Sequence, residues 1–168
     1  DIADFDINFA RTRLPDLRPQ DANQQVFHLG DGQDTGLPSE SFDVVTSWNL
    51  LEHVPDHRKL IREAFRVLKP GGFFIGIAPN YLAFRKEAHY HVPWFPLFPR
   101  NLAHHYLINQ GLNPRFCDED IHYITSWGIE QAMRSAGFRT VVLENHKLRH
   151  PEKIHSDSLR DRVIRIQN

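Results

Sequence analysis

Residues 37–80 read LPSESFDVVTSWNLLEHVPDHRKLIREAFRVLKPGGFFIGIAPN, and this stretch decides the fold because it contains a complete strand–helix–strand unit. Residues 42–47 are rich in β-branched and aromatic side chains, which is typical of a buried parallel strand. Residues 73–78 form a second apolar run and predict the other strand. Strands joined by a helix pair in parallel, so the stretch predicts one unit of a doubly wound α/β sheet.

The residues between these two runs predict an amphipathic helix. Apolar side chains recur there with helical spacing, which places them on one face. Asp56 is expected to cap the first turn, and Pro70-Gly71-Gly72 to end the helix. The apolar face consists of Leu60, Ile61, Ala64, Phe65 and Leu68.

A ligand site is expected directly after the first strand. Ligands of doubly wound sheets bind outside the carboxyl ends of the strands, and residues 48–53 (WNLLEH) fall there. Glu52 and His53 are the polar pair in this loop. His53 can act as a catalytic base, because imidazole titrates near neutral pH, or it can help to structure the loop.

The stretch also resembles a known family. FDVV, then LLEHV, then a helix that ends RVLKPGG, then an apolar strand, is similar to the second half of class I S-adenosylmethionine-dependent methyltransferases, and to their small-molecule group in particular. The likeness extends more weakly over residues 2–143. It implies a Rossmann-like doubly wound sheet, with S-adenosylmethionine as cofactor and S-adenosylhomocysteine as product.

The resemblance assigns cofactor contacts near the start of the chain. The family's ribose-binding acidic residue ends its second strand, and Asp6, followed by Ile7, matches that position in the expected strand 2–7. A carboxylate suits this role because it accepts two hydrogen bonds from a diol. The alternative for Asp6 is a solvated acidic residue near a terminus.

Two further contacts follow from the resemblance. Asp31 would meet the adenine amino group and Gly32 would offer a backbone N–H to the ring, although Asp-Gly is also an ordinary turn and Asp34 is the alternative. Ser47, Trp48 and Asn49 would line the pocket. For Trp48 the alternative is a place in the core.

The family's glycine-rich loop of the DxGxGxG type, which follows its first strand, has no counterpart in this sequence. The glycines at 30, 32 and 36 belong after the family's third strand. We therefore expect the first strand and its loop to precede Asp1 in a longer polypeptide. The alternative is direct pairing of residues 2–7 with residues 42–47 in a degenerate domain.

Further elements are predicted on both sides of this stretch. We expect a helix over 9–14 that Pro15 ends, a strand over 26–29, a helix from Ser126 that Gly137 ends, and a strand over 138–144. Residues 146–168 are polar, with a weak amphipathic helix or a last strand as the options.

Residues 81–125, which we call the insert, depart from the sheet pattern. They are rich in proline, histidine and aromatic residues, and only residues 102–108 predict a helix. Long irregular insertions are usually lids or binding loops, so we expect an acceptor-binding lid within one domain over 1–168. We expect no metal site, because no acidic residue has a familiar spacing such as HExxH. The side chains expected to line or cover the acceptor pocket instead are His89, Tyr90, His91, Trp94, His104, His105, His122 and Tyr123.

Composition bounds the function further. The chain has 168 residues, enough for one domain, and a net charge of −1, which gives no reason to expect nucleic-acid binding. No window is long and apolar enough to span a membrane, although the HVPWFPLFPR run is compatible with peripheral membrane contact. A single cysteine excludes an internal disulfide, and a cytoplasmic setting is the default.

The leading hypothesis is methyl transfer to a small-molecule acceptor, with a glycan- or lipid-linked metabolite as one option. The second hypothesis is a non-catalytic methyltransferase-like module that binds a partner or a nucleotide-like ligand. A metal-dependent hydrolase is the third, and tightly bound metal would be required for it.

Overall fold

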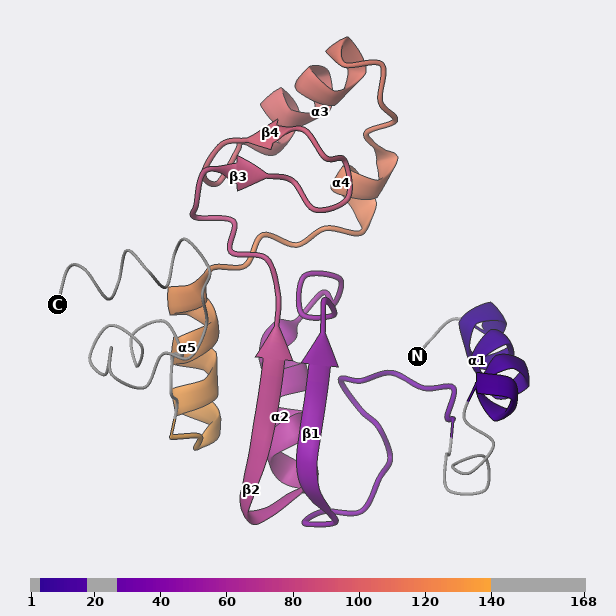
Figure 1. The fold of residues 1–168 in the computed structure, drawn as a ribbon. Helices are drawn as coiled ribbons and strands as arrows, with labels where there is room; N and C mark the ends of the chain where they lie inside the picture. The colour runs from indigo at the N-terminus through magenta and orange to yellow at the C-terminus, as the bar shows by residue number, and fades with distance from the viewer. Residues whose placement is uncertain (1–3, 18–26, 140–168) are drawn as a thin grey trace, which may run out of the picture.

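The computed structural model describes residues 4–17 and 27–139 of the chain (Figure 1). Within these ranges a parallel two-stranded unit lies next to a smaller layer formed by the insert (Figure 1). The elements, in chain order, are α1 Asp4–Leu17, β1 Phe42–Trp48, α2 His57–Val67, β2 Leu68–Ile77, β3 Arg85–Lys86, β4 Pro93–Trp94, α3 Arg100–Asn109, α4 Arg115–Glu119 and α5 Ser126–Ala136.

The predicted strand–helix–strand unit is confirmed. β1 and β2 pair in parallel, and the register from Val44↔Phe73 to Trp48↔Ile77 is regular. At the start of β2 the register shifts: Phe42 pairs with Leu68, Val44 pairs with Phe73, and residues 69–72 between them have no partner in β1. A Cβ at Gly72 would lie 2.9 Å from the Asp43 carbonyl oxygen, so this close approach requires glycine.

The predicted start of α2 is also confirmed. The Asp56 side chain accepts hydrogen bonds from the backbone N–H groups of Arg58 at 3.0 Å and Lys59 at 3.2 Å, which satisfies two donors that a helix leaves unpaired. The helix ends at Val67, shortly before the proline–glycine run. Its buried side includes Leu60, Ile61 and Ala64, as the apolar spacing predicts. Two predicted members of that face differ: Phe65 is 43% exposed, and Leu68 belongs to β2.

Only one face of the sheet is covered within the described residues. α2 lies behind β1 and β2 (Figure 1), and inward-facing Val45 lines a cavity together with Leu60 of that helix. The alternate side chains face away from α2, and they are 48% to 68% exposed. They are Val44, Trp48, Phe73, Ile75 and Ile77.

α5 packs beside α2 and confirms the predicted helix from Ser126. Gly137 ends it with φ 107° and donates its N–H to Arg134, as expected for a glycine after a helix. Phe138 then packs edge-on against Phe65 of α2, with ring centroids 4.9 Å apart. The predicted strand over 138–144 lies outside the described residues beyond Arg139, as does the tail over 146–168.

The insert contains β3 and β4, which pair antiparallel, together with α3 and α4. It lies beyond the carboxyl ends of β1 and β2 (Figure 1). α3 includes the helix predicted over 102–108 and extends it at both ends. Tyr81, Trp94, Leu107, Cys117 and Ile121 form its packed centre and are at most 1% exposed.

Two predicted strands near the start of the chain are wrong. Asp4 to Ile7 belong to α1 rather than to a strand, and this helix continues past Pro15 to Leu17 instead of ending there. Phe27 to Leu29 have no regular structure. The backbone N–H and C=O groups of a strand need hydrogen-bond partners on a neighbouring strand, whereas those of a helix bond to one another. No described strand lies beside either segment. Residues 2, 3 and 26 lie outside the described ranges.

Across the described ranges, none of the helices combines the length and the apolar character that a membrane span requires.

Candidate functional site

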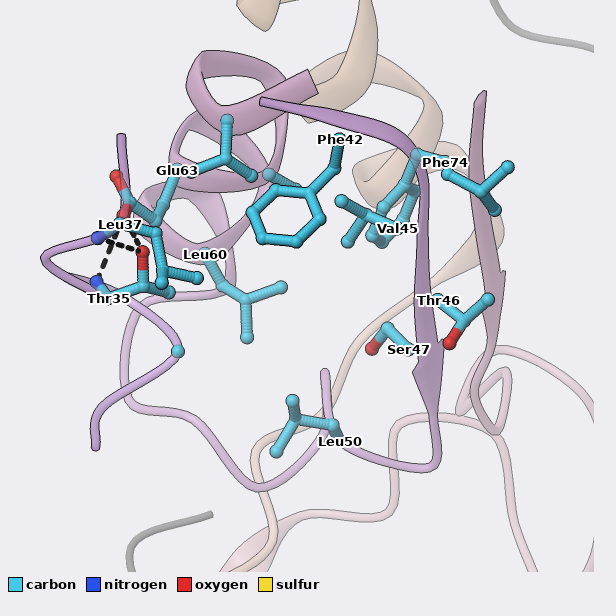
Figure 2. Close-up of a pocket in the computed structure, with 14 residues that line it drawn as sticks. Thr35, Leu37, Phe42, Val45, Thr46, Ser47, Leu50, Leu60, Glu63 and Phe74 are labelled. Carbon is cyan, nitrogen blue, oxygen red and sulfur yellow. Dashed lines mark hydrogen bonds between the residues drawn. The ribbon is translucent and has the colours of Figure 1, made fainter. Parts of the chain in front are cut away.

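A cavity of about 300 Å³ lies between β1, α2 and the segment over 32–37 (Figure 2). We call it the β1 cavity. Its wall is mostly apolar, which is usual for pockets that bind small molecules. The side chains and backbone used below are Gly32, Thr35, Ser47, Leu50, Leu60 and Glu63.

Ser47 gives the β1 cavity an unsatisfied polar group. Its side chain is 3% exposed, and its hydroxyl has no hydrogen-bond partner in the described part of the chain. Figure 2 shows this hydroxyl on the cavity side of β1. An unpaired buried hydroxyl costs about 1–3 kcal/mol. The arrangement therefore suits a ligand that carries a hydrogen-bonding group.

A charged network fixes the segment that forms the opposite wall. Glu63 of α2 accepts hydrogen bonds from the Thr35 N–H at 2.9 Å and from the Arg66 guanidinium at 2.7 and 2.8 Å. Arg66 also donates to the Leu37 carbonyl oxygen at 2.7 Å. The Arg66 hydrogen bond, assisted by Thr35, lowers the pKa of Glu63 from 4.5 to about 2. The ionised pair thus holds residues 35–37 against α2.

Asp31 and Gly32 lie in a tight turn at the rim of the β1 cavity. The exposed Asp31 carboxylate accepts the Gln33 N–H at 2.8 Å and the Gln33 side-chain amide at 3.2 Å, so the ordinary turn is present. A Cβ at Gly32 would lie 3.4 Å from Leu60 and 3.9 Å from Leu50. Gly32 therefore lies close to the loop that follows β1.

Trp48 and Asn49 stand where β1 ends. Asn49 has φ 48°, in the left-handed region that asparagine tolerates better than most residues, and its N–H donates to the Ile77 carbonyl oxygen at 2.8 Å. This turn redirects the chain at the carboxyl edge of the sheet. Trp48 is 60% exposed, so it is no part of the core among the described residues.

The structure does not bring Asp6 and Ile7 to this cavity. Asp6 lies on the exposed side of α1, whereas Ile7 is 6% exposed. Of the described residues that line the β1 cavity, none belongs to α1. α1 stands apart from the sheet (Figure 1), because a helix replaces the strand on which the sequence placed Asp6.

His53 lies in a second polar cluster, at the junction of the loop after β1 with the insert. Its Nδ1 is 3.0 Å from the Asp120 carbonyl oxygen, and its Nε2 is 3.9 Å from a Glu52 carboxylate oxygen. Its ring meets His89 edge-on, with centroids 5.0 Å apart, and Phe116 packs against both rings. Glu52, His53 and His89 can each be singled out in the sequence as polar residues. No local pattern predicts that His53 and His89, 36 positions apart, lie in contact.

Glu87 organises the insert side of this cluster. Its buried carboxylate accepts hydrogen bonds from the Tyr81 hydroxyl at 3.0 Å, the Tyr90 N–H at 2.8 Å, and the His89 N–H and ring. Burial raises the pKa of Glu87, but these hydrogen bonds outweigh it and hold the pKa below its ordinary value. The orientation of His89 is therefore fixed by an ionised neighbour.

Comparison with known proteins shows that the chain is similar to methyltransferases. Residues 1–76 match the family model described as a methyltransferase domain. A demethylmenaquinone methyltransferase of Listeria welshimeri is 37% identical over 69 residues, which are 41% of this chain and 29% of that protein. A ubiquinone biosynthesis O-methyltransferase of Pseudomonas fluorescens is 53% identical over 47 residues, which are 27% of this chain and 20% of that protein.

Solved structures agree on the fold. A Bacillus halodurans chain assigned as a methyltransferase aligns with a TM-score of 0.54 and 19% identity, over 82% of this chain and 51% of that chain. A Galdieria sulphuraria chain assigned as a sarcosine dimethylglycine methyltransferase aligns with a TM-score of 0.54 and 15% identity, over 98% of this chain and 59% of that chain.

The predicted resemblance to class I S-adenosylmethionine-dependent methyltransferases is therefore confirmed, and so is the Rossmann-like α/β fold class. The chain spans less than a third of the two curated relatives named above and a little over half of the two solved chains.

Proposed function

We propose that the protein transfers a methyl group from S-adenosylmethionine to a small-molecule acceptor, at the carboxyl edge of β1. The family match over residues 1–76 supports the reaction class. The observation that carries the location is the buried Ser47 hydroxyl on the wall of the β1 cavity, which no described residue meets with a hydrogen bond. A buried polar group without a partner is rare unless a ligand or water uses it.

The residues around the β1 cavity fit part of the cofactor. Ser47 supplies a hydroxyl, Asn49 an amide at the strand end, and the Asp31–Gly32 turn an exposed carboxylate and backbone at the opposite rim. The sulfonium of bound S-adenosylmethionine would supply the electrophilic methyl group. The ribose contact assigned to Asp6 and Ile7 has no support from their positions on α1, and it stays a prediction from the resemblance.

The remaining task of the chain is to hold the acceptor and remove its proton. The insert stands beyond the carboxyl edge of the sheet and is the segment we assign to acceptor binding (Figure 1). His53 is the proposed base. Its Nδ1 faces a carbonyl oxygen, which requires a hydrogen on that nitrogen, so Nε2 carries the lone pair in the neutral ring.

The acceptor class follows from the relatives only as an expectation. Two of them are named for menaquinone and ubiquinone synthesis. In the insert, Phe84 is 66% exposed and Phe95 is 53% exposed. Exposed aromatic side chains of this kind suit an apolar, lipid-linked acceptor or peripheral contact with a membrane. A cytoplasmic setting is part of the same proposal.

Methyl transfer tests the proposal directly. Labelled S-adenosylmethionine is incubated with the protein and a panel of phenolic, amine and lipid-linked acceptors, and label in the acceptor is counted. His53→Gln should lower kcat by about 10²–10⁴-fold without changing the affinity for S-adenosylhomocysteine. Glu130→Gln, which neutralises a carboxylate of α5 outside the insert, should leave both values unchanged.

The alternative is a non-catalytic binding module. Tight binding of S-adenosylhomocysteine with no transfer to any acceptor in the panel would favour a module that retains the nucleoside site. The absence of both binding and transfer would contradict the proposed function.

A further inference from the structure

We propose that Glu52, His53 and His89 bind a divalent transition-metal ion, with Zn²⁺ as the best match. One carboxylate oxygen of Glu52 and one ring nitrogen of each histidine all lie within 4.8 Å of one another. The sequence predicts no metal site, because no acidic residue has a familiar spacing such as HExxH. The fold brings them together by placing the insert against the loop after β1.

The surroundings of both histidines match those of metal ligands. Metal-binding histidines usually donate their second ring N–H to a carboxylate or to a backbone carbonyl. His53 Nδ1 stands 3.0 Å from the Asp120 carbonyl oxygen, and His89 Nδ1 stands 3.1 Å from the Glu87 carboxylate. Each ring therefore has its Nδ1 proton engaged and keeps the lone pair of Nε2 available.

Glu52 provides an independent observation. Its side chain is 1% exposed, and neither carboxylate oxygen accepts a hydrogen bond from any residue of the described part of the chain. Burial of a carboxylate without a compensating partner is costly, and buried charges in proteins are normally paired or bound to metal. His53 Nε2 lies 3.9 Å from a Glu52 carboxylate oxygen, which is beyond hydrogen-bonding distance. A cation at this point would compensate the charge of Glu52.

The donor set selects the metal. Two imidazole nitrogens and one carboxylate oxygen suit zinc and its first-row neighbours, whereas magnesium and calcium prefer oxygen ligands. Bonds of about 2.0–2.1 Å to a tetrahedral ion separate its ligands by roughly 3.4 Å. The present spacing of up to 4.8 Å is wider, so the side chains must close by up to about 1.4 Å around the ion. Three protein ligands leave one position open for water or another small ligand.

The site would also join two parts of the molecule. Glu52 and His53 belong to the loop after β1, whereas His89 lies between β3 and β4 of the insert. The Glu52 carbonyl oxygen already accepts the His122 N–H at 2.7 Å, and His53 Nδ1 lies 3.0 Å from the Asp120 carbonyl oxygen, so a metal would add a further connection at this junction. Metal binding should consequently stabilise the docking of the insert.

Zinc binding tests the inference. The protein is stripped with a chelator and titrated with ZnCl₂ by calorimetry, and bound metal is measured by elemental analysis after gel filtration. We expect one zinc ion per chain and a higher Tm in its presence. Absence of bound zinc after gel filtration would overturn the proposal.

Three variants separate metal binding from folding. Glu52→Gln and His89→Gln should each weaken zinc binding by at least about tenfold, whereas His105→Ala should bind as the wild type does. The metal-free Glu52→Gln protein should be at least as stable as the wild type, because the uncompensated buried charge is gone. Zinc affinity that is unchanged in both Glu52→Gln and His89→Gln would contradict the assignment of these ligands.

Measurement of S-adenosylhomocysteine affinity on the same metal-free protein separates this inference from the proposed function. The β1 cavity does not include Glu52, His53 or His89, so nucleoside binding should survive removal of zinc. Failure of zinc binding with intact nucleoside binding would overturn only the metal site. Bound zinc would occupy the Nε2 lone pair of His53 that the proposed base requires, so methyl transfer is also measured on the metal-free protein.

Discussion

The strand–helix–strand unit and the insert bury their apolar side chains to very different degrees. In the insert, which the sequence predicts to be an irregular lid, Trp94 and Leu107 are fully buried. In the sheet, which the sequence predicts as a buried core, Trp48, Phe73 and Ile77 are 51% to 68% exposed. A segment that packs on itself needs only its own residues, whereas a doubly wound sheet needs helices on both faces. Regular patterning therefore predicts an element, but its burial depends on its neighbours.

The two tryptophans give the sharpest test of this contrast. Trp94→Ala should cost about 3–5 kcal/mol of unfolding free energy, because a large cavity opens in the centre of the insert. Trp48→Ala removes a side chain that is 60% exposed and should cost less than about 1 kcal/mol. Urea unfolding of both variants measures the difference. Equal losses would mean that the sheet face is covered in solution.

A second prediction concerns the charged network between α2 and the segment over 35–37. Glu63→Gln should lower the unfolding free energy by about 1.5–3 kcal/mol at neutral pH, because charge-assisted hydrogen bonds to Arg66 and Thr35 weaken. Glu130→Gln removes a surface pair with Arg134 and should cost less than about 0.5 kcal/mol.

The same network predicts a pH dependence. The pKa of Glu63 falls to about 2 in the folded protein, below its ordinary value of 4.5. A lowered folded pKa stabilises the protein above the unfolded pKa, and this contribution is lost as the pH falls from about 4.5 toward 2. The wild type and Glu63→Gln should therefore converge in stability across this window. A difference that stays constant down to pH 2 would contradict the assigned ion pair.

The smallest expected effect is at the helix cap. Asp56→Ala should cost about 1 kcal/mol, because two backbone N–H groups at the start of α2 lose their acceptor. Asp34→Ala, at an exposed carboxylate outside any helix, is the matched control. Thermal unfolding monitored by circular dichroism compares the two. If Asp34→Ala lowered the unfolding free energy as much as Asp56→Ala, the result would contradict a capping role for Asp56.

Local sequence signals predicted β1, α2, β2 and α5, since each carries its own periodicity and end residues. These signals gave a wrong prediction at α1, where two isoleucines and a phenylalanine suggested a strand. The segment is a helix, and no described strand lies beside it to supply hydrogen-bond partners. The site divides in the same way. The resemblance assigned both Ser47 and Asp6 to the cofactor. Ser47 lies on the wall of the β1 cavity, whereas Asp6 lies on α1, because a helix replaces the strand on which the sequence placed it.

The Glu52–His53–His89 cluster shows a further limit of sequence reasoning. Adjacent Glu52 and His53 stand out as a polar pair, but His89 belongs to a histidine-rich run with several equivalent members. Only the packing of the insert selects His89 from that run. Burial of Glu52, which makes the cluster chemically notable, likewise depends on contacts that no spacing rule describes.

Calorimetric titration of the protein with S-adenosylhomocysteine tests the central claim most directly, with the wild type and Ser47→Ala compared. If the carboxyl edge of β1 binds the nucleoside, the wild type should bind in the micromolar range. The variant should then lose about tenfold, because the Ser47 hydroxyl no longer meets the ligand. No binding by the wild type, or equal affinity in the two proteins, would contradict the assignment of this cavity as the cofactor site.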